Sequence, residues 1–373
     1  MQVAIPSMLM RGGTSKGLYF KASDLPEDIT VRDRILLAAM GSPDERQIDG
    51  MGGAHPLTSK VAILSPSNDD DLDIDYLFLQ IVVDEGRVSD AQNCGNILAG
   101  VGPFAIECGM ISPTGETTDV RIRMLNTGAK AVARVQTPNG KVEYEGQARI
   151  DGVPGTAAPV PIEFLDIAGS SCGALLPTGQ AKDLINGVEV TCIDNGMPVV
   201  LLRAQDFGLT GNEDPQSLEE NSELKARIEA IRLQAGIKMN LGDVATKTVP
   251  KMSLISAALK GGVLNTRTFI PHRVHESIGV LGSVSIATAC MLPGTLAQEY
   301  LRKPVVGPLQ QLEIEHPSGS FKVEIEVDTE ADTETKSATT DGVVVKRAAL
   351  LRTARLLMRG EVYVPANAIG SKT

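Results

Sequence analysis

Two segments of this chain are apolar on nearly every side, and they constrain its fold more than any other feature. They are residues 94–107, CGNILAGVGPFAIE, and residues 282–292, GSVSIATACML. A helix that is apolar all round has to be surrounded by protein. Short β-branched segments bounded by turn residues lie on both sides of each segment. We therefore predict an α+β protein of two similar domains, each with a sheet wrapped around one buried helix. The alternative is a single sandwich that uses one segment as a buried helix and the other as a strand.

The rest of the pattern predicts strands and hairpins. Short β-branched segments predict strands at 120–125, 188–193 and 198–202. Asn139-Gly140 predicts a hairpin between 130–136 and 141–150, because a type I′ turn needs a positive φ at both positions. A second hairpin is predicted over 312–327, with its turn at 317–319.

Three amphipathic surface helices and one loop complete the prediction. The helices are expected at 31–40, at 217–239 with a capping box of Ser217 and Glu220, and at 347–358. The polar segment 328–342 is typical of an exposed loop.

Charge and composition exclude some classes of partner. The chain has 373 residues, enough for two domains, and a formal net charge of -11. Aromatic residues make up 3% and Trp is absent. These values argue against nucleic acid or an anionic membrane as a partner, because both attract basic surfaces and bases stack on aromatic rings.

The cysteines and the apolar runs indicate the compartment. Five cysteines without a C-x-x-C spacing fit a reducing environment. No basic stretch precedes the first apolar residues, and the longest uncharged apolar run, 278–292, is shorter than the roughly 20 residues that span a bilayer. We therefore expect a cytoplasmic protein.

Cys94 is the first candidate for chemistry, since it lies in Asn93-Cys94-Gly95-Asn96 at the start of the first buried segment. Helix N-termini carry unpaired N–H groups and a positive potential, which bind anions and favour thiolates. A thiolate there could take a proton from carbon while the N–H groups of Gly95 and Asn96 hold a carboxylate. The alternative is an inert buried thiol, but two Asn beside a Gly are poor residues for a dry helix start.

Lys60 is the second candidate, because it ends the tract GGAHPLTSK and an apolar run follows at once. Desolvation at the mouth of a buried strand favours the neutral amine, which can act as a base. The alternative is a surface lysine at a strand end. The tract GGTSKG at 12–17 lacks the G-x-x-x-x-G-K-[ST] spacing of a phosphate loop, so nucleotide binding is not predicted.

A second anion site is predicted near the second buried segment. His272, Arg273 and His275 lie just upstream of Gly282-Ser283, where we expect a helix to start. The alternative is a solvated loop. Metal-ligand spacings and a G-x-S-x-G elbow are both absent, so neither a metal site nor a serine hydrolase is predicted.

Long tracts of the chain resemble the PrpF-type isomerases. They include MRGGTSKG (10–17), MGSPDERQIDGMGGAHPLTSK (40–60), DIDYLF (73–78), NCGNILAGVGPFAI (93–106), EYEGQARIDGVPGTAAPV (143–160) and GEVYVP (360–365). The resemblance implies the diaminopimelate-epimerase fold, in which each of two pseudo-symmetric domains is a barrel-like sheet around one helix and the active site lies in the cleft. It also implies that the last strand returns to the first domain. We therefore expect domains of 1–148 plus 347–373 and of 149–346.

The resemblance also implies the roles of individual residues. Epimerases of this fold carry a cysteine before each helix start, whereas Leu281 precedes Gly282-Ser283 here, which argues against a two-thiol racemase. Lys60 and Cys94 become the proposed catalytic pair. The implied substrate-binding residues are Arg11, Ser15, Ser59, Asn93, Gly95, Asn96, His272, Arg273, His275, Gly282 and Ser283.

The implied activity is an isomerisation that needs no cofactor and no metal. A base takes an acidic proton next to a double bond, and its return at another atom gives the isomer. The segment before TSK favours keto–enol tautomerisation of 4-oxalomesaconate over cis–trans isomerisation of 2-methylaconitate or turnover of another unsaturated polycarboxylate. A non-catalytic module that binds small acids is the alternative class. A small polycarboxylate is the expected partner, and a homodimer is a possible assembly.

Overall fold

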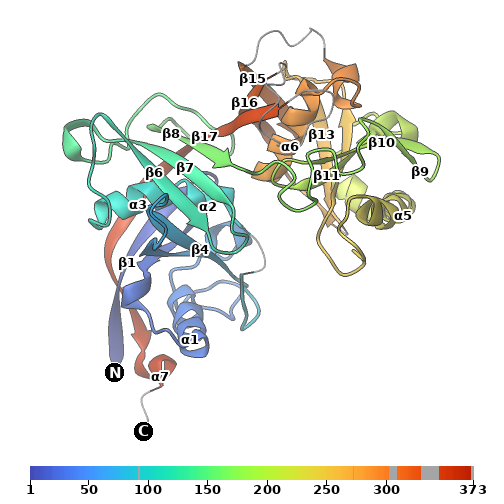
Figure 1. Cartoon of the computed structure of the whole chain (residues 1–373). Helices are drawn as coiled ribbons and strands as arrows, with labels where there is room; N and C mark the ends of the chain where they lie inside the picture. The colour runs from blue at the N-terminus through green and yellow to red at the C-terminus, as the bar shows by residue number, and fades with distance from the viewer. Residues whose placement is uncertain (91–92, 272, 302–308, 329–343, 371–373) are drawn as a thin grey trace. The chain divides into compact units, whose positions relative to one another are not determined.

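The computed structural model describes residues 1–90, 93–271, 273–301, 309–328 and 344–370 (Figure 1). The chain forms two compact units. Unit 1 comprises Met1–Glu163 and Leu351–Thr373, and unit 2 comprises Phe164–Leu350. The sequence predicts divisions after residues 148 and 346, whereas these units divide after residues 163 and 350.

Unit 1 is a mixed sheet with helices on both faces. Its strands are β1 (Gln2–Gly12), β2 (Ser15–Lys21), β3 (Lys60–Pro66), β4 (Ile74–Ile81), β5 (Val88–Ser89), β6 (Thr117–Met124), β7 (Lys130–Gln136), most of β8 (Pro159–Leu165) and the second part of β17 (Val344–Pro365). Its helices are α1 (Ile29–Met40), α2 (Gly95–Leu98), α3 (Val101–Glu107) and α7 (Ala366–Ile369), with short 3₁₀ turns at Ala22–Asp24, Pro56–Thr58 and Pro138–Gly140. The strands pair in the order β8–β17–β1–β2–β3–β4–β6–β7, and β5 pairs with β4.

Unit 2 repeats this plan. Its strands are β9 (Asp183–Ile185), β10 (Val188–Asp194), β11 (Pro198–Arg203), β12 (Lys251–Ser256), β13 (Leu264–Ile270), β14 (Arg273–Val274), β15 (Leu309–His316), β16 (Gly319–Asp328) and the first part of β17. Its helices are α4 (Pro215–Glu220), α5 (Ser222–Lys238) and α6 (Val280–Met291), with 3₁₀ turns at Ala204–Phe207 and Ala297–Tyr300. The strands pair in the order β9–β10–β11–β12–β13–β15–β16–β17, and β14 pairs with β13.

Strand directions show that the two units are built alike. In unit 1, β1–β2, β3–β4 and β6–β7 are antiparallel, while β2–β3 and β4–β6 are parallel. In unit 2, β10–β11, β12–β13 and β15–β16 are antiparallel, while β11–β12 and β13–β15 are parallel. The two predicted similar α+β units are therefore present.

Each unit has a buried inner helix and an outer helix. In unit 1, Tyr19 donates a hydrogen bond to the carbonyl of Ile97 in α2, and its neighbours Leu18 and Phe20 pack toward α1. Successive strand residues point to opposite faces, so α2 and α1 lie on opposite faces of β2. In unit 2, residues 282–291 of α6 are all buried, while α5 packs on the side chains of Met252 and Leu254 in β12. None of the helices within the described ranges is long and apolar enough to span a membrane.

Several expected elements differ in detail. Segment 94–107 is helical but bends at Ala99–Gly100, between α2 and α3. The helix predicted at 217–239 is two helices, because Asn221 ends α4 and caps α5 by accepting a hydrogen bond from the Leu224 N–H. The capping box is also wrong, since Asp214 caps α4.

The prediction of a helix at 347–358 is wrong, because this segment lies within strand β17. β17 pairs with β16 in unit 2 and with β1 in unit 1, and this pairing with strands distant in sequence overrides the local pattern. Asn139 and Gly140 do have positive φ values, of 56° and 72°, but no strand follows them at 141–150. The hairpin over 312–327 is confirmed, with His316 opposite Gly319. The predicted loop at 328–342 lies outside the described residues except for Asp328.

Candidate active site

Cys94 lies at the N-cap of α2, with an extended backbone and a half-buried thiol. Its carbonyl accepts hydrogen bonds from the Leu98 N–H at 3.0 Å and from the Tyr76 hydroxyl at 3.4 Å. α2 has a single turn, and Ala99 and Gly100 interrupt the regular helix before α3, so the first helix is shorter than the sequence suggested. The immediate surroundings of the thiol therefore matter more than the helix.

Those surroundings are two buried phenols and a buried guanidinium. Tyr19 and Tyr76 are fully buried, and burial raises the pKa of each well above its usual value, with a further increase from Cys94. Both remain neutral donors. The side chain of Arg352 on β17 is only 2% exposed. Burial lowers the pKa of Arg352 to about 10 and the charge of Cys94 opposes that change, so Arg352 is a cation at neutral pH.

Lys60 is the first residue of β3, and its side chain is buried at 6% exposure. The Lys60 Nζ atom donates to Gln80 Oε1 at 2.7 Å and lies 5.0 Å from the centroid of the Phe78 ring. The amide group of Gln80 is itself fixed by bonds to the carbonyls of Pro56 and Ser59. The amine is thus held in one place by a neutral acceptor and an aromatic face.

Lys60 and Cys94 both contact side chains on one face of β4. Tyr76, Phe78 and Gln80 alternate along this strand and therefore point to one side. The first of them contacts Cys94, and the other two contact Lys60. The structure thus brings the two predicted catalytic residues to the inner side of the sheet of unit 1.

Polar atoms without partners mark the same region. The Asn93 Oδ1 and Ser15 Oγ atoms are buried, and neither has a hydrogen-bond partner within the described residues. The Asn93 Nδ2 atom donates to Thr127 Oγ1 at 2.5 Å, and the Asn96 Oδ1 atom accepts from the Thr14 N–H at 3.5 Å. A buried polar atom that lacks a partner is costly, so both oxygen atoms are candidates for contact with a ligand.

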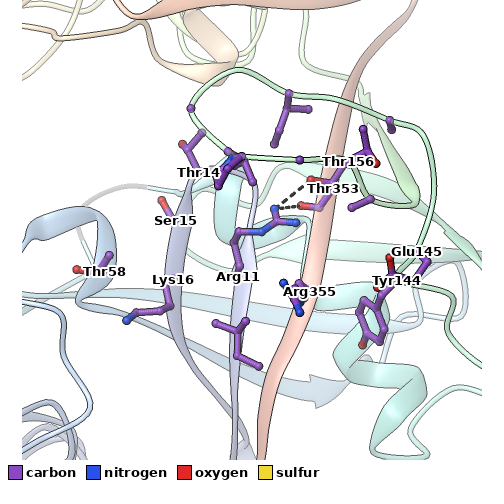
Figure 2. A pocket seen from close by; sticks show the side chains of 18 residues that line it. Arg11, Thr14, Ser15, Lys16, Thr58, Tyr144, Glu145, Thr156, Thr353 and Arg355 are labelled. Carbon is purple, nitrogen blue, oxygen red and sulfur yellow. Dashed lines mark hydrogen bonds between the residues drawn. The ribbon is translucent and has the colours of Figure 1, made fainter.

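Three other predicted residues of unit 1 have different surroundings. The Ser59 hydroxyl donates to Gln47 Oε1 at 2.7 Å and to the His55 carbonyl at 2.9 Å, so it holds the preceding loop. Gly95 is the first residue of α2. Arg11 points away from the inner face, since its neighbour Gly12 is the residue that touches the backbone of Asn96 and Ile97. Arg11 instead borders a pocket with Thr14, Ser15 and Lys16 (Figure 2).

The surroundings of the residues predicted in unit 2 differ from those that the sequence led us to expect. α6 begins at Val280 with Gly279 as its N-cap, so its start lies earlier than predicted. Gly282 and Ser283 are buried within the first turn, and the Ser283 N–H already bonds the Gly279 carbonyl. The free N–H groups of this helix start therefore belong to the residues before Ser283.

The predicted cations near α6 also differ. Arg273 is exposed in β14, and His272 lies outside the described residues. Burial lowers the pKa of His275, and the charge of Lys251 lowers it further, so the expected imidazolium is a neutral ring at neutral pH. Its Nδ1 atom accepts from the Ser277 N–H at 2.9 Å, which leaves Nε2 as the donor.

Arg352 is a functional candidate that the sequence did not reveal. The segment around it has an apparent helical pattern, whereas the structure places Arg352 in β17, which pairs with β1 from the other end of the chain. Within the described residues, no group of three or more His, Cys, Asp or Glu side chains is arranged to hold a metal ion.

The fold matches solved structures along the whole chain. The crystal structure of a methylitaconate-delta-isomerase has a TM-score of 0.84 and 33% identity, and the match covers 100% of this chain and 98% of that one. A hydroxyproline epimerase from Agrobacterium vitis has a TM-score of 0.53 and 14% identity, with 99% and 96% of the two chains covered. The predicted diaminopimelate-epimerase-like fold is thereby confirmed.

Sequence comparison identifies much closer relatives. The chain is 59% identical over 363 residues to the 4-oxalomesaconate tautomerase of Pseudomonas putida KT2440, covering 97% of each chain. It is also 59% identical over 359 residues to the (4E)-oxalomesaconate Delta-isomerase of Novosphingobium sp. KA1, covering 96% of this chain and 97% of the relative. The family model described as PrpF protein matches residues 2–365. The chain therefore belongs to the PrpF family.

Proposed function

We propose that this protein isomerises 4-oxalomesaconate by moving one proton between two atoms of the conjugated acid, with Lys60 and Cys94 as the catalytic pair. The observation that carries the proposal is that both residues contact side chains on one face of β4, in a chain that belongs to this family. The 59% identity to two relatives named for oxalomesaconate supports the choice of substrate.

The chemistry needs one base, one acid and a place for negative charge. One member of the pair removes the acidic proton from carbon, and the electron pair delocalises onto the conjugated oxygen atoms of the substrate. The other member delivers a proton to another atom of the same conjugated system, so no oxidant, reductant or cofactor takes part. The buried guanidinium of Arg352 favours negative charge next to Cys94.

The names of the two relatives describe two fates of one carbanion. A tautomerase moves the proton between carbon and oxygen, whereas a Delta-isomerase moves the double bond along the carbon chain. Both start from the same deprotonation. NMR of the product formed in deuterated water distinguishes them, because only the second outcome places deuterium on a new carbon.

The test is exchange in deuterated water with wild type, Lys60→Met and Cys94→Ser. Loss of the base abolishes both deuterium exchange and product formation, whereas loss of the acid leaves exchange at the substrate carbon and stops product formation. The two variants therefore assign the two roles. We expect Arg352→Met to slow product formation on the order of a hundredfold.

Matched controls are available in the same unit. Lys141 is exposed, and Cys108 is a half-buried thiol at the end of α3, so Lys141→Met and Cys108→Ser should keep wild-type rates. Full activity in folded Lys60→Met would refute the base–acid pair. Absence of exchange in the wild type would refute the activity and favour a binding module.

2-Methylaconitate is the second candidate substrate. The match to a methylitaconate-delta-isomerase over the whole chain favours an allylic proton shift on a methyl-branched acid as well. The same NMR assay with 2-methylaconitate compares the two acids, and we expect the larger kcat/KM for 4-oxalomesaconate.

A further inference from the structure

Three basic residues lie side by side across the sheet of unit 1. Arg11 on β1 is directly opposite Arg355 on β17 and directly opposite Lys16 on β2. Residues directly opposite one another share a face of the sheet, so these three side chains form one row across three strands. We call Arg355, Arg11 and Lys16 the basic row.

This arrangement is unfavourable by itself. Like charges directly opposite on neighbouring strands destabilise a sheet. No member of the basic row has an ion pair with any of the described residues, although many other arginines of the chain do. Burial lowers the pKa of Arg11, and the charge of Arg355 lowers it further. Within the part of the chain that the structure describes, the row therefore has no acidic side chain paired with it.

A pocket of about 350 Å³ lies over the basic row. Figure 2 shows Arg11, Arg355 and Lys16 on adjacent strands, with a loop of the chain above them. The loop contributes all six residues from Gly152 to Ala157 to the lining of the pocket. Glu145 is the single acidic residue of the lining. The volume suits a small metabolite, and the lining carries a net positive charge.

The orientation of Arg11 is fixed from within the sheet. The Arg11 Nη1 atom donates to the carbonyls of Gly13 at 2.9 Å and Thr353 at 3.0 Å, and to Thr353 Oγ1 at 3.0 Å. These bonds use one end of the guanidinium and hold its plane. The remaining N–H groups stay available for a planar anionic group such as carboxylate or phosphate.

This pocket is separate from the pair Lys60 and Cys94. Gly12 and Gly17 are the residues that touch Asn96 and Lys60, and each is the sequence neighbour of a member of the basic row. Neighbouring residues of a strand point to opposite faces. The sheet of unit 1 therefore stands between the basic row and the pair Lys60 and Cys94. Neither of these two residues lines the pocket, although Ser15 at the end of β2 does.

We propose that the pocket over Arg355, Arg11 and Lys16 is a second anion site, which binds a compact ligand with two or more carboxylate or phosphate groups. Such a ligand would supply the missing counter-charge and bridge neighbouring strands. Arg355 and Arg11 offer paired N–H donors to one group, and Lys16 offers a point charge to the next. The proposal is independent of the reaction that the chain catalyses.

Isothermal titration calorimetry with citrate and with inorganic phosphate tests the site. The wild type should bind at least one of them, and the stronger of the two identifies the carboxylate or the phosphate class. Arg355→Gln and Lys16→Gln should each weaken this binding about tenfold or more through loss of a charge-assisted contact. Arg359→Gln is the matched control on β17, because Arg359 is already paired with Glu107, and it should bind like the wild type.

Two further measurements make the outcome decisive. Lys60→Met should bind the anion as the wild type does, which separates this site from the catalytic pair. In buffer without multivalent anions, Arg355→Gln should melt at or above the temperature of the wild type, because one repulsion is removed. Absence of citrate and phosphate binding in the wild type would overturn the proposal, as would binding that is lost in Lys60→Met and retained in Arg355→Gln.

Discussion

Single residues acquire their chemistry here from what surrounds them. Five thiols are present, and burial raises the pKa of Cys192 and Cys290 to about 12. Burial also raises the pKa of Cys108 and Cys172. Cys94 differs because it interacts electrostatically with a buried guanidinium, that of Arg352. The nearby buried cation sets Cys94 apart from the other four thiols, which agrees with the role that we propose for it.

Lys251 provides a prediction at this scale. Burial lowers its pKa to about 8, and Arg232 adds to the effect. Between pH 8 and the higher pKa of the unfolded chain, the unfolded state holds a proton that the folded state has released. Unfolding then takes up protons, so stability rises with pH across this window. Below pH 8 both states are protonated, and the cost of burying the charge is fully present.

The measurement is the free energy of unfolding in denaturant at pH 7 and pH 9.5. The wild type should gain stability relative to Lys251→Met between these pH values. Lys247→Met removes an exposed neighbouring lysine and should show no such trend. A difference between wild type and Lys251→Met that stays constant with pH would contradict the prediction.

Among the elements, the close approach of β2 to β3 positions Lys60. These strands are parallel, and Gly17 is the partner of Lys60 in their register. A Cβ atom at Gly17 would lie 2.2 Å from the Lys60 carbonyl oxygen and 2.7 Å from its carbonyl carbon. Both are backbone atoms, which cannot move aside as a flexible side chain could. The absence of a side chain at Gly17 thus sets where Lys60, the proposed catalytic residue, begins its strand.

We expect Gly17→Ala to separate β2 from β3 at Lys60. The variant should lose about 1–3 kcal/mol of stability through overpacking, and its isomerase rate should fall more than that of the control. Gly86→Ala is the control, because nothing lies within 4 Å of the added atom and its φ is not positive. Denaturant unfolding and the deuterium-exchange assay measure the two effects. Wild-type stability and rate in Gly17→Ala would show that the strands can adjust.

The strand pairings also explain which features could be predicted from the sequence and which could not. Lys60 and Cys94 could be identified because local patterns, an apolar run and a polar start to an apolar segment, surround them. Arg352 could not, because its burial depends on β17 lying beside a strand some 340 positions away, as the Arg11–Thr353 bond with a separation of 342 illustrates. The basic row depends on register in the same way, since sequence alone does not place Arg355 opposite Arg11. A local sequence pattern contains no information about which distant strands pair with one another, and this pairing decides both features.

At the scale of the whole molecule, a repeated strand order carries different residues at corresponding positions of the two units. Lys60 begins β3 and Lys251 begins β12, which are the corresponding strands of the two units. Both lysines lie opposite a residue of a neighbouring parallel strand. Lys60 lies opposite Gly17, and Lys251 lies opposite Val199. The two helix starts differ, however, because Cys94 is the N-cap of α2 whereas Gly279 is the N-cap of α6. The repeated strand order therefore carries a thiol at only one of the two corresponding helix starts.

The connection between the units predicts different behaviour for the two halves when separated. Unit 2 is one continuous piece, 164–350, with its own core of α5 against β11 and β12. Expressed alone, it should unfold cooperatively in denaturant, as followed by circular dichroism. The piece 1–163 lacks the part of β17 that lies between β8 and β1, so it should not fold until residues 351–373 are joined to it through a flexible linker. Cooperative unfolding of 1–163 alone would show that β17 is dispensable for the core of unit 1. A non-cooperative 164–350 would show that the core of unit 2 depends on the rest of the chain.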